Sequence, residues 1–542
     1  MGEIPFQSHL DLVEFRQEAF ENLLHEGSFS PLLLKHILGM FCLVLVPLLI
    51  RPTNTFLSQL IRYTFHAIFT GFSIYAVLHV RFIGPGNGYS VGLIATWFFI
   101  WSSTILVFND VQKDFKRIEK EYVQSSSPPV HDSFQSRGTL GPNDTKHHPD
   151  TSSIVVPRHK GKRKVYHWQS FPDSFPHRVD WVLDLILNFR GPNWSWRART
   201  SPLPNFVLND IGDQGGSRQV IVSKLIVPDS STRLRQALLS FLRDYIALDI
   251  IKVLMMRDQY FWGFVDNYPP PPWPFVIVSF SPILVRIYRL LLSMSGVFFA
   301  LDIIVSLDPL FFLGLSLAFP RFSRSITHQP LDEAWLYPPP FGPASSVLDY
   351  GLIGAWNTWW HQLFRFGFSE SGRFVSFLII PVTRKQQHSS YTLVRRLLQV
   401  LVAFSMSGLI HAMGSYTAFA DTKPFNTFLF FFLQGIAVLA QGLFFSQKAQ
   451  PQPRRAAPLT TRALNFALVF LWFYFTAPLA ADDFARSGLW TFEPLPISPI
   501  RGLVLRWWGV EGWEKEGWFC WKSLWVERWN GETWWQSGTR FR

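Results

Sequence analysis

The sequence predicts an all-α integral membrane protein, a polytopic bundle of about eight or nine transmembrane helices. Two features of its composition support this fold class: 48% of the 542 residues are hydrophobic, and only 16% are charged. Charged residues make up about a quarter of an ordinary soluble domain, so this deficit favours a chain that lies in lipid. The third observation is a series of apolar runs, each close to the roughly 20 residues that a helix needs to cross a membrane.

These apolar runs fall into an early and a late group. The early group covers residues 31–50, 63–80 and 89–108, and the late group covers residues 237–256, 282–319, 397–414, 427–446 and 463–479. The run at 282–319 is too long for one simple crossing and contains Asp302 and Asp308. We therefore expect a tilted helix, a broken helix or two separate segments there.

The segment between the two groups is basic. It contains KDFKRIEK at 113–120 and RHKGKRK at 158–164, and the positive-inside rule puts such a loop in the cytosol. Ser, Pro, His and Asp are abundant over residues 123–164, which is typical of a disordered insert. Membrane topology and contact with anionic lipid or an anionic cofactor explain the net charge of +12 better than nucleic acid does. No nucleic-acid partner is therefore expected.

The same patterns predict four regions along the chain. These are N-terminal transmembrane helices at 1–108, a cytosolic and partly disordered insert at 109–165, a membrane domain at 166–480 and a Trp-rich tail at 481–542. The membrane domain opens with Trp181, Leu185 and Asn188 at the spacing of an amphipathic helix, which we expect to lie at the membrane interface.

His411 is an ionisable residue within the apolar segment FSMSGLIHAMGSYTA. Burying such a group in a membrane costs free energy unless something compensates it, so it is a functional candidate. On a helix, Ser407, Gly408, Gly414 and Ser415 would share its face and form a furrow of small side chains around the imidazole. A plain helix–helix contact explains the small residues equally well, because they let two helices approach closely.

A second group of polar residues lies in AWNTWWHQLFR, residues 355–365. If this segment is helical, Asn357, His361 and Arg365 form one polar stripe, bordered by Trp356 and Trp360. Tryptophans usually mark a membrane interface, so an interfacial helix with a hydrated polar face is the alternative interpretation.

The two groups together favour proton-transfer chemistry. A neutral histidine can take a proton from an alcohol near pH 7. An amide, a second imidazole and a guanidinium can donate hydrogen bonds to a developing oxyanion or to an anionic cofactor. The predicted catalytic residues are His411, His361 and Asn357, and the predicted substrate- or cofactor-binding residues are Trp360, Gln362, Arg365 and Ser407.

Other chemistries find little support in the sequence. It contains no GxSxG nucleophile elbow, no HExxH motif and no Gly-rich phosphate loop. Cys42 and Cys520 are its two cysteines, and no metal site is predicted. His328 and Asp332 match the HxxxD motif of soluble CoA-dependent acyltransferases, but they lie in a proline-bounded loop without the rest of that pattern. We interpret this match as coincidental.

Four stretches resemble the wax-synthase-like branch of the membrane-bound O-acyltransferases, especially its fungal members. They are WQSFPDSFPHRVDWVLDLILNFRGPNW at 168–194, YPPPFGPASSVLDYGLIGAWNTWWHQLFR at 337–365, SMSGLIHAMG at 405–414 and FFLQGIAVLAQ at 431–441. The most specific part is the WHQ block followed by the Ser-Gly-x-x-His helix, whose histidines lie fifty positions apart. The chain departs from the family block at Ala355, where phenylalanine is usual, and at Thr358 and Trp359, where basic residues are usual.

This resemblance implies a helical bundle that encloses a catalytic tunnel, with acyl-CoA arriving from the cytosol and the acceptor arriving through the membrane. It implies His411 as general base and His361 as its partner, with Asn357 as the second candidate. It implies acyl-CoA as a co-substrate, acetyl-CoA being the expected donor, and no permanently bound cofactor. The expected acceptor is a hydroxyl of a lipophilic specialised metabolite such as a terpenoid or meroterpenoid, and the expected location is the endoplasmic reticulum.

Three alternative functions remain open at this point. Within the family, the chain is alternatively a wax synthase that acylates long-chain fatty alcohols. From other classes, it is alternatively a transporter that uses Asp302, Asp308 and His411 as relay groups, or a non-catalytic membrane scaffold.

Overall fold

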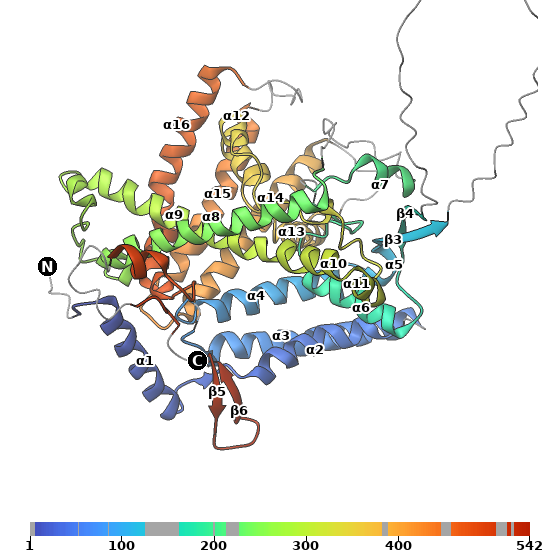
Figure 1. Ribbon diagram of the computed structural model, residues 1–542, viewed down its shortest axis with the longest axis horizontal. Coiled ribbons are helices and arrows are strands. Elements are labelled where there is room, and N and C mark those ends of the chain that lie inside the picture. The colour runs from blue at the N-terminus through green and yellow to red at the C-terminus, as the bar shows by residue number, and fades with distance from the viewer. Residues whose placement is uncertain are drawn as a thin grey trace, which may run out of the picture.

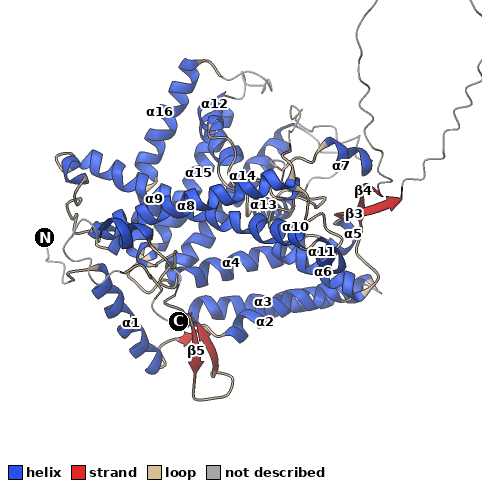
Figure 2. Cartoon of the chain, in the orientation of Figure 1, coloured by secondary structure: helices blue, strands red, loops and turns tan. Residues whose placement is uncertain are grey.

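The computed structural model describes most of the chain. The described residues are 6–51, 54–84, 86–124, 162–198, 201–212, 227–381, 389–445, 457–505, 517–521 and 525–541. Helices dominate them, as Figure 2 shows, and the all-α membrane class predicted from the sequence is confirmed.

The N-terminal part of the chain forms helices that lie along one side of the molecule (Figure 1). Its elements are α1 (His9–His25), β1 (Ser30–Pro31), α2 (Leu34–Leu49), α3 (Thr55–His79), β2 (Val80–Arg81), α4 (Tyr89–Ser103), the π-helical turn η1 (Thr104–Phe108) and α5 (Val111–Asp114). Helices α2, α3 and α4 pack side by side in chain order.

The middle part carries a β-hairpin and then the longest helices. Its elements are β3 (Arg117–Gln124), β4 (Lys162–Gln169), α6 (Phe175–Leu187), α7 (Asn205–Asp210), α8 (Ser230–Arg257), η2 (Gln259–Trp262), η3 (Phe275–Val278), α9 (Pro282–Asp308), η4 (Pro309–Leu313), α10 (Gly314–Ala318), α11 (Pro320–Ile326) and η5 (Ala334–Leu336).

The C-terminal part contains both predicted histidine motifs. Its elements are α12 (Ser345–Gly354), η6 (Ala355–Trp359), α13 (Arg365–Ile379), α14 (Ser389–Thr417), α15 (Pro424–Phe445), α16 (Leu459–Thr476), α17 (Pro478–Arg486), η7 (Leu489–Thr491), η8 (Ile500–Leu505), β5 (Val526–Trp529) and β6 (Gly538–Phe541).

Five helical segments of the described chain are long and apolar enough to cross a membrane. They are Tyr89–Phe108, Pro282–Ala318, Tyr391–Thr417, Pro424–Phe444 and Leu459–Thr476. The other three predicted runs are also helical, but α2 has only 16 residues and polar side chains interrupt α3 and α8. The protein is therefore a multi-pass membrane protein. Five of the eight predicted runs meet the length and hydropathy expected of a membrane-spanning helix.

The long run at 282–319 forms one helical stretch. Helix α9 passes into the π-helical turn η4 at Pro309 and continues as α10, and the stretch ends where Phe319 leaves the helical conformation, with φ −128° and ψ 63°. A proline has no N–H to donate to the preceding turn, which explains why the helix widens at this position. Asp308 is the last residue before this change of geometry.

The predicted basic insert begins and ends in a hairpin. Strands β3 and β4 pair antiparallel, with Arg117 opposite Gln169 and Gln124 opposite Lys162, and residues 125–161 lie outside the described part. Arg117 is fully buried, and its guanidinium forms ion pairs with Asp180 at 2.6 Å and with Glu119 at 3.1 Å. Asp180 belongs to α6, so the Arg117–Asp180 ion pair joins the hairpin to this helix. The structure confirms that the predicted amphipathic segment is helical.

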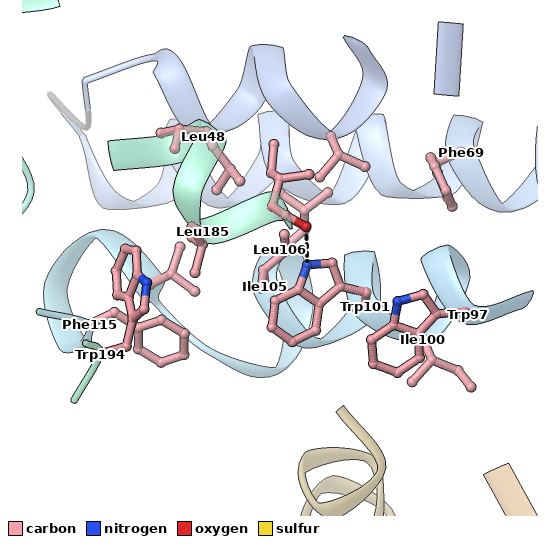
Figure 3. Close-up of a cluster of buried hydrophobic side chains, with 14 of the residues drawn as sticks. Leu48, Phe69, Trp97, Ile100, Trp101, Ile105, Leu106, Phe115, Leu185 and Trp194 are labelled. Atoms are coloured by element: carbon pink, nitrogen blue, oxygen red, sulfur yellow. Dashed lines mark hydrogen bonds between the residues drawn. The ribbon is translucent and has the colours of Figure 1, made fainter. Parts of the chain in front are cut away.

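Tryptophans fill the core around α4 and α6. Figure 3 shows Trp97 and Trp101 of α4 beside Leu185 of α6 and Trp194, all of them buried. The indole N–H of Trp101 donates to the carbonyl oxygen of Ile186 at 3.0 Å. The other side of α4 packs on α14, which also packs on α13 and α15. Helix α14, which carries His411, is therefore surrounded by packed helices.

Helices α4 and α14 approach each other closely at Gly92. A Cβ atom at this position would lie 1.9 Å from the carbonyl oxygen of Met413. We expect Gly92→Ala to force the two helices apart and to lower the free energy of unfolding by about 1–3 kcal/mol. Thermal unfolding of the detergent-solubilised protein would measure this as a lower melting temperature.

Gly71→Ala is the matched control. Gly71 lies inside α3, and a Cβ there would meet nothing within 4 Å. Alanine is favoured over glycine in a helix by about 1 kcal/mol, so this variant should melt at the same temperature as the wild type or higher. Equal melting temperatures for the two variants would contradict the close approach of α4 and α14.

Candidate active site

His411 lies six residues before the end of α14, and its imidazole faces Tyr89 at the start of α4. The Tyr89 hydroxyl donates to the backbone carbonyl oxygen of His411 at 2.9 Å and lies 3.2 Å from the ring nitrogen Nδ1. Gly414 makes this approach possible, because a Cβ there would lie 2.5 Å from the Tyr89 ring.

These two contacts favour one tautomer of the neutral His411 ring. A tyrosine hydroxyl has one proton, and a carbonyl oxygen can only accept a hydrogen bond. If the Tyr89 proton points at the carbonyl of His411, its oxygen accepts from Nδ1–H. The neutral ring then carries its proton on Nδ1 and a free lone pair on Nε2, which is the form that a general base needs.

Two aromatic rings also contact the imidazole. Phe431 of α15 stacks on it with ring centroids 4.6 Å apart and an interplanar angle of 8°, and Phe484 of α17 lies at 6.0 Å. Phe431 also contacts Trp356, at 6.3 Å. This phenylalanine therefore joins the His411 helix to the WHQ block.

The predicted furrow of small residues is not an open groove. A Cβ on Gly408 would lie 2.9 Å from the backbone oxygen of Phe428, and Gly414 is covered by Tyr89. The expectation that these small residues leave room for a ligand is wrong at both glycines, which instead let α4 and α15 approach α14. Ser407 is half-buried and precedes His411 by four residues, and its binding role stays a prediction.

The condition for the polar stripe is not met, because residues 355–365 do not form one continuous helix. Residues Ala355–Trp359 form one π-helical turn, Trp360 is extended with φ −66° and ψ 148°, and α13 begins only at Arg365. The cause lies in the preceding proline-rich connector: the N–H of Gly342 donates to the carbonyl oxygen of Trp359 at 2.9 Å and occupies the acceptor that the next helical turn would use. The predicted stripe of Asn357, His361 and Arg365 therefore does not exist as a helical face.

Gln362 and Arg365 hold the irregular turn that replaces the helix. The amide of Gln362 donates to the carbonyl oxygen of Trp360 at 2.7 Å, and the Arg365 guanidinium donates to the Gln362 side chain at 2.6 Å and to the Asn357 carbonyl at 2.9 Å. These contacts give both residues a role in shaping the turn. Their predicted role in binding a substrate or cofactor stays a prediction.

The turn directs His361 into the protein. Its ring lies 5.1 Å from the ring of Trp360 and 6.4 Å from that of Phe341, and its Nδ1 atom is buried without a hydrogen-bond partner in the described part of the chain. Burial, followed by the nearby charges of His411 and Arg190, lowers the pKa of His361 to about 3. His361 is therefore neutral at physiological pH.

This pKa shift predicts how stability depends on pH. The pKa is about 3 in the folded chain and about 6.5 in the unfolded one, so the stabilising contribution of neutral His361 is present above pH 6.5 and is lost as pH falls toward 3. We expect acidification from about pH 6.5 to 5 to destabilise the wild type by about 1–2 kcal/mol more than His361→Gln. Melting temperatures across this range would measure the difference, and parallel curves would contradict it.

The structure does not bring Asn357 to His411. Its side chain is exposed, and within the described residues it forms no hydrogen bond with either histidine. Of the two candidate partners for His411, only His361 has a pKa that the charge of His411 influences. Trp360 borders His361 and thus stays adjacent to the predicted site.

The structure contains a cavity of about 680 Å³. Leu363 lines it, and so does Arg190, whose guanidinium donates to the carbonyl oxygens of Pro338 and Pro339 at 2.8 Å. Helix α6 forms one wall, and α9, η4 and α11 form the other. Neither His361 nor His411 is among the residues that line this cavity.

Three residues of the site were missed by the sequence reasoning. Tyr89, Phe431 and Arg190 all contact or influence the histidines, yet Tyr89 is 322 positions from His411. Arg190 lies within the stretch 168–194 that carries the family resemblance, so its position was a reason to consider it as a site residue. Phe431 also lies within such a stretch, at 431–441, whereas Tyr89 is an aromatic residue in an apolar run that nothing local distinguishes from an ordinary core residue.

Comparison with known proteins supports the resemblance seen in the sequence. Residues 337–433 match the sequence profile of the membrane bound O-acyl transferase family. This stretch contains both histidines, the WHQ turn and Phe431. No solved structure matches the chain.

Several fungal proteins are similar to parts of the chain. Acetyltransferase eriL of Hericium erinaceus is 32% identical over 164 residues, which cover 29% of this chain and 39% of that protein. Acetyltransferase aurG of Calcarisporium arbuscula is 23% identical over 229 residues, or 41% of this chain and 49% of that protein. O-Mevalon transferase yanI of Aspergillus niger is 25% identical over 242 residues, or 44% of this chain and 46% of that protein. The matched regions thus span less than half of each relative.

Proposed function

We propose that this chain, whose residues 337–433 carry the pattern of the membrane bound O-acyl transferase family, transfers an acetyl group from acetyl-CoA to a lipophilic alcohol. The observation that supports this most is that one family match encloses both His361 and His411. The names of the similar fungal proteins favour acetyl over a longer acyl group, since two of those cited above are acetyltransferases. The family match favours this function over a transporter or a scaffold.

In the proposed mechanism, His411 is the general base. Its Nε2 lone pair takes the proton of the acceptor hydroxyl while the oxygen attacks the thioester carbonyl of acetyl-CoA. The tetrahedral intermediate then expels the CoA thiolate, which takes the proton back from the His411 imidazolium. The products are the ester and CoA as a free thiol, and neither a metal nor an acyl-enzyme is needed.

We assign oxyanion stabilisation to His361. Its buried Nδ1 has no partner in the described chain, and a buried polar atom without a partner is costly unless a ligand satisfies it. A neutral imidazole protonated at this atom can donate to the negative oxygen of the intermediate. Asn357 remains the alternative donor.

Tyr89→Phe tests the proposed orientation of the His411 ring. The variant keeps the ring that fills the space over Gly414 but removes the hydroxyl that contacts Nδ1 and the carbonyl. Losing one such hydrogen bond is worth about 1–1.5 kcal/mol, so we expect kcat to fall about 10-fold with little change in KM for either substrate. An unchanged kcat would mean that Tyr89 has no influence on the base.

Radiolabelled transfer in microsomes tests the function itself. Acetyl-CoA and palmitoyl-CoA are supplied separately with sterol, terpenoid and fatty alcohols, and labelled esters are separated by chromatography. We expect acetyl transfer to terpenoid or meroterpenoid alcohols, with the protein in endoplasmic-reticulum membranes. Transfer of palmitate to fatty alcohols alone would identify a wax synthase, and no transfer to any alcohol by folded protein would contradict the proposal.

A further inference from the structure

Three aromatic rings lie against the imidazole of the proposed base, and each comes from a different helix. The hydroxyl of Tyr89, at the start of α4, lies 3.2 Å from Nδ1 of His411. Phe431 of α15 stacks on the imidazole with ring centroids 4.6 Å apart, and Phe484 of α17 lies at 6.0 Å. Phe484 also meets the Tyr89 ring edge-on, at 5.7 Å and 90°. The orientation of the imidazole therefore depends on how α4, α15 and α17 are held together.

Asp483 of α17 joins two of these helices through its carboxylate. Its Oδ2 atom accepts from the hydroxyl of Thr427 at 2.6 Å, and its Oδ1 atom accepts from the backbone N–H of Lys423 at 2.5 Å. Both donors lie at the start of α15, since Lys423 directly precedes its first residue. The Asp483 and Thr427 side chains are buried, at 1% and 0% exposure. The carboxylate is stabilised by two charge-assisted hydrogen bonds and by the dipole of the helix whose N-terminus it contacts.

The positions of Asp483 and Thr427 in their helices connect this contact to the base. Asp483 immediately precedes Phe484 in α17, so holding its carboxylate restricts the position of the neighbouring ring. Thr427 precedes Phe431 by four residues in α15, and residues at this spacing share one face of a helix. One face of α15 thus carries both the hydroxyl that donates to Asp483 and the ring that stacks on His411.

Directed hydrogen bonds, more than charge pairing, hold the Asp483 carboxylate. Arg486, three residues later in α17, forms its ion pair with Asp266, and within the described chain it reaches Asp483 only through the longer-range effect of its charge. A buried polar contact whose donors and acceptors are satisfied makes the packing of its helices more rigid and more specific than apolar contacts do. The contact between Asp483 and the start of α15 therefore defines how α17 sits on α15.

We propose that Asp483 is a positioning residue for His411. By joining α17 to α15, it holds Phe484 and Phe431 where they keep the imidazole directed at the acceptor hydroxyl. The inference rests on the proposed acetyl transfer, in which His411 is the base, and it adds a residue that acts through the base rather than on the substrates. Orientation matters to this step, because a displacement of about 1 Å in a reacting group can lower a rate about 10²-fold.

Matched variants and two acceptors test this proposal. The variants are Asp483→Asn, Thr427→Val, Thr427→Ser and, as the control, Thr104→Val. The acceptors are a terpenoid alcohol and its analogue with fluorine atoms beside the hydroxyl, each assayed with labelled acetyl-CoA. Fluorine makes the hydroxyl more acidic, so its attack depends less on a general base. Thr104 suits the control because it is buried like Thr427, while its hydroxyl donates to the Ile100 carbonyl within its own helical segment.

The variants should separate an effect on the base from a general loss of structure. We expect Asp483→Asn and Thr427→Val to lower kcat about 10-fold with the ordinary alcohol and less than about threefold with the fluorinated one. KM for acetyl-CoA and for both alcohols should stay within about twofold of the wild type, since neither residue contacts a substrate in the proposed mechanism. Thr427→Ser keeps the hydroxyl and should recover most of the rate. The double variant Asp483→Asn/Thr427→Val should lose no more than the larger single effect, because both substitutions remove the same contact. Thr104→Val should stay within about twofold of the wild type with both acceptors.

Other outcomes overturn the inference in distinct ways. Equal losses with the two alcohols would show that Asp483 supports the fold and does not act through the base. A raised KM with unchanged kcat would make it a binding residue, and an unchanged rate in Thr427→Val would show that the contact has no influence on His411. If Asp483→Asn does not fold, as its melting temperature would record, Thr427→Val and Thr427→Ser decide by the same criteria. In each of these cases the wild type still transfers acetyl groups, whereas failure of the proposed function would show as no transfer by the wild type at all.

Discussion

Replacing His411 with alanine is expected to slow acetyl transfer about 10²- to 10⁴-fold, the usual contribution of a general base. The loss should appear in kcat, since the imidazole acts on the reacting hydroxyl. The measurement is the rate of labelled ester formation in microsomes at matched protein levels. Because His411 also stacks on Phe431 and contacts Tyr89, the melting temperature of each variant should be recorded beside its activity.

His328→Ala is the matched control for this experiment. His328 is exposed and forms the first position of the HxxxD match, which we interpret as coincidental. Its substitution should leave acetyl transfer within about twofold of the wild type, since surface substitutions away from a site usually have small effects. Full activity in His411→Ala, or its loss in His328→Ala, would reverse the assignment of the base.

The second large effect is expected at His361. Removing one donor to an oxyanion usually lowers kcat about 10²- to 10³-fold, and we expect this loss in His361→Ala. The reason is its Nδ1 atom, which is buried without a hydrogen-bond partner in the described part of the chain. The rate at saturating substrate, measured together with KM for acetyl-CoA and for the alcohol, separates oxyanion stabilisation from binding.

Asn357→Ala decides between the two candidate partners. The Asn357 side chain is exposed, and its backbone carbonyl, which accepts from Arg365, is unaffected by the substitution. We therefore expect a change of less than about tenfold in kcat, which corresponds to less than 1.4 kcal/mol in the barrier. A loss in Asn357→Ala that exceeds the loss in His361→Ala would give the oxyanion role to the amide.

Some residues of the resembling stretches have a structural role that explains their presence in the pattern. Gln362 and Arg365 satisfy the carbonyls left free where the helix stops, and this directs His361 inward. Arg190, from another resembling stretch, ties α6 to Pro338 and Pro339 of the connector before this turn. Separate motifs in the sequence thus meet at one wall of one cavity.

The sequence by itself determined the membrane class, the helical nature of all eight predicted runs, and the residues around which the site is built. Apolar runs of helical length fix the class, because backbone groups inside lipid must satisfy one another. The two histidine motifs were found because ionisable and polar residues stand out against apolar surroundings. The long run at 282–319 was expected to be tilted, broken or divided, but the position of its π-helical turn at Pro309 came only from the structure.

Only the tertiary structure decided what surrounds those residues. The helix predicted through His361 fails because Gly342 takes a carbonyl from the WHQ turn, and the furrow beside His411 is filled because α4 and α15 approach its glycines. Tyr89 reaches His411 across 322 positions, and Asp308 faces a cavity while Asp302 is paired. Periodicity describes one helix at a time, whereas these contacts depend on how separate helices pack, and packing is set by shape complementarity across the whole bundle.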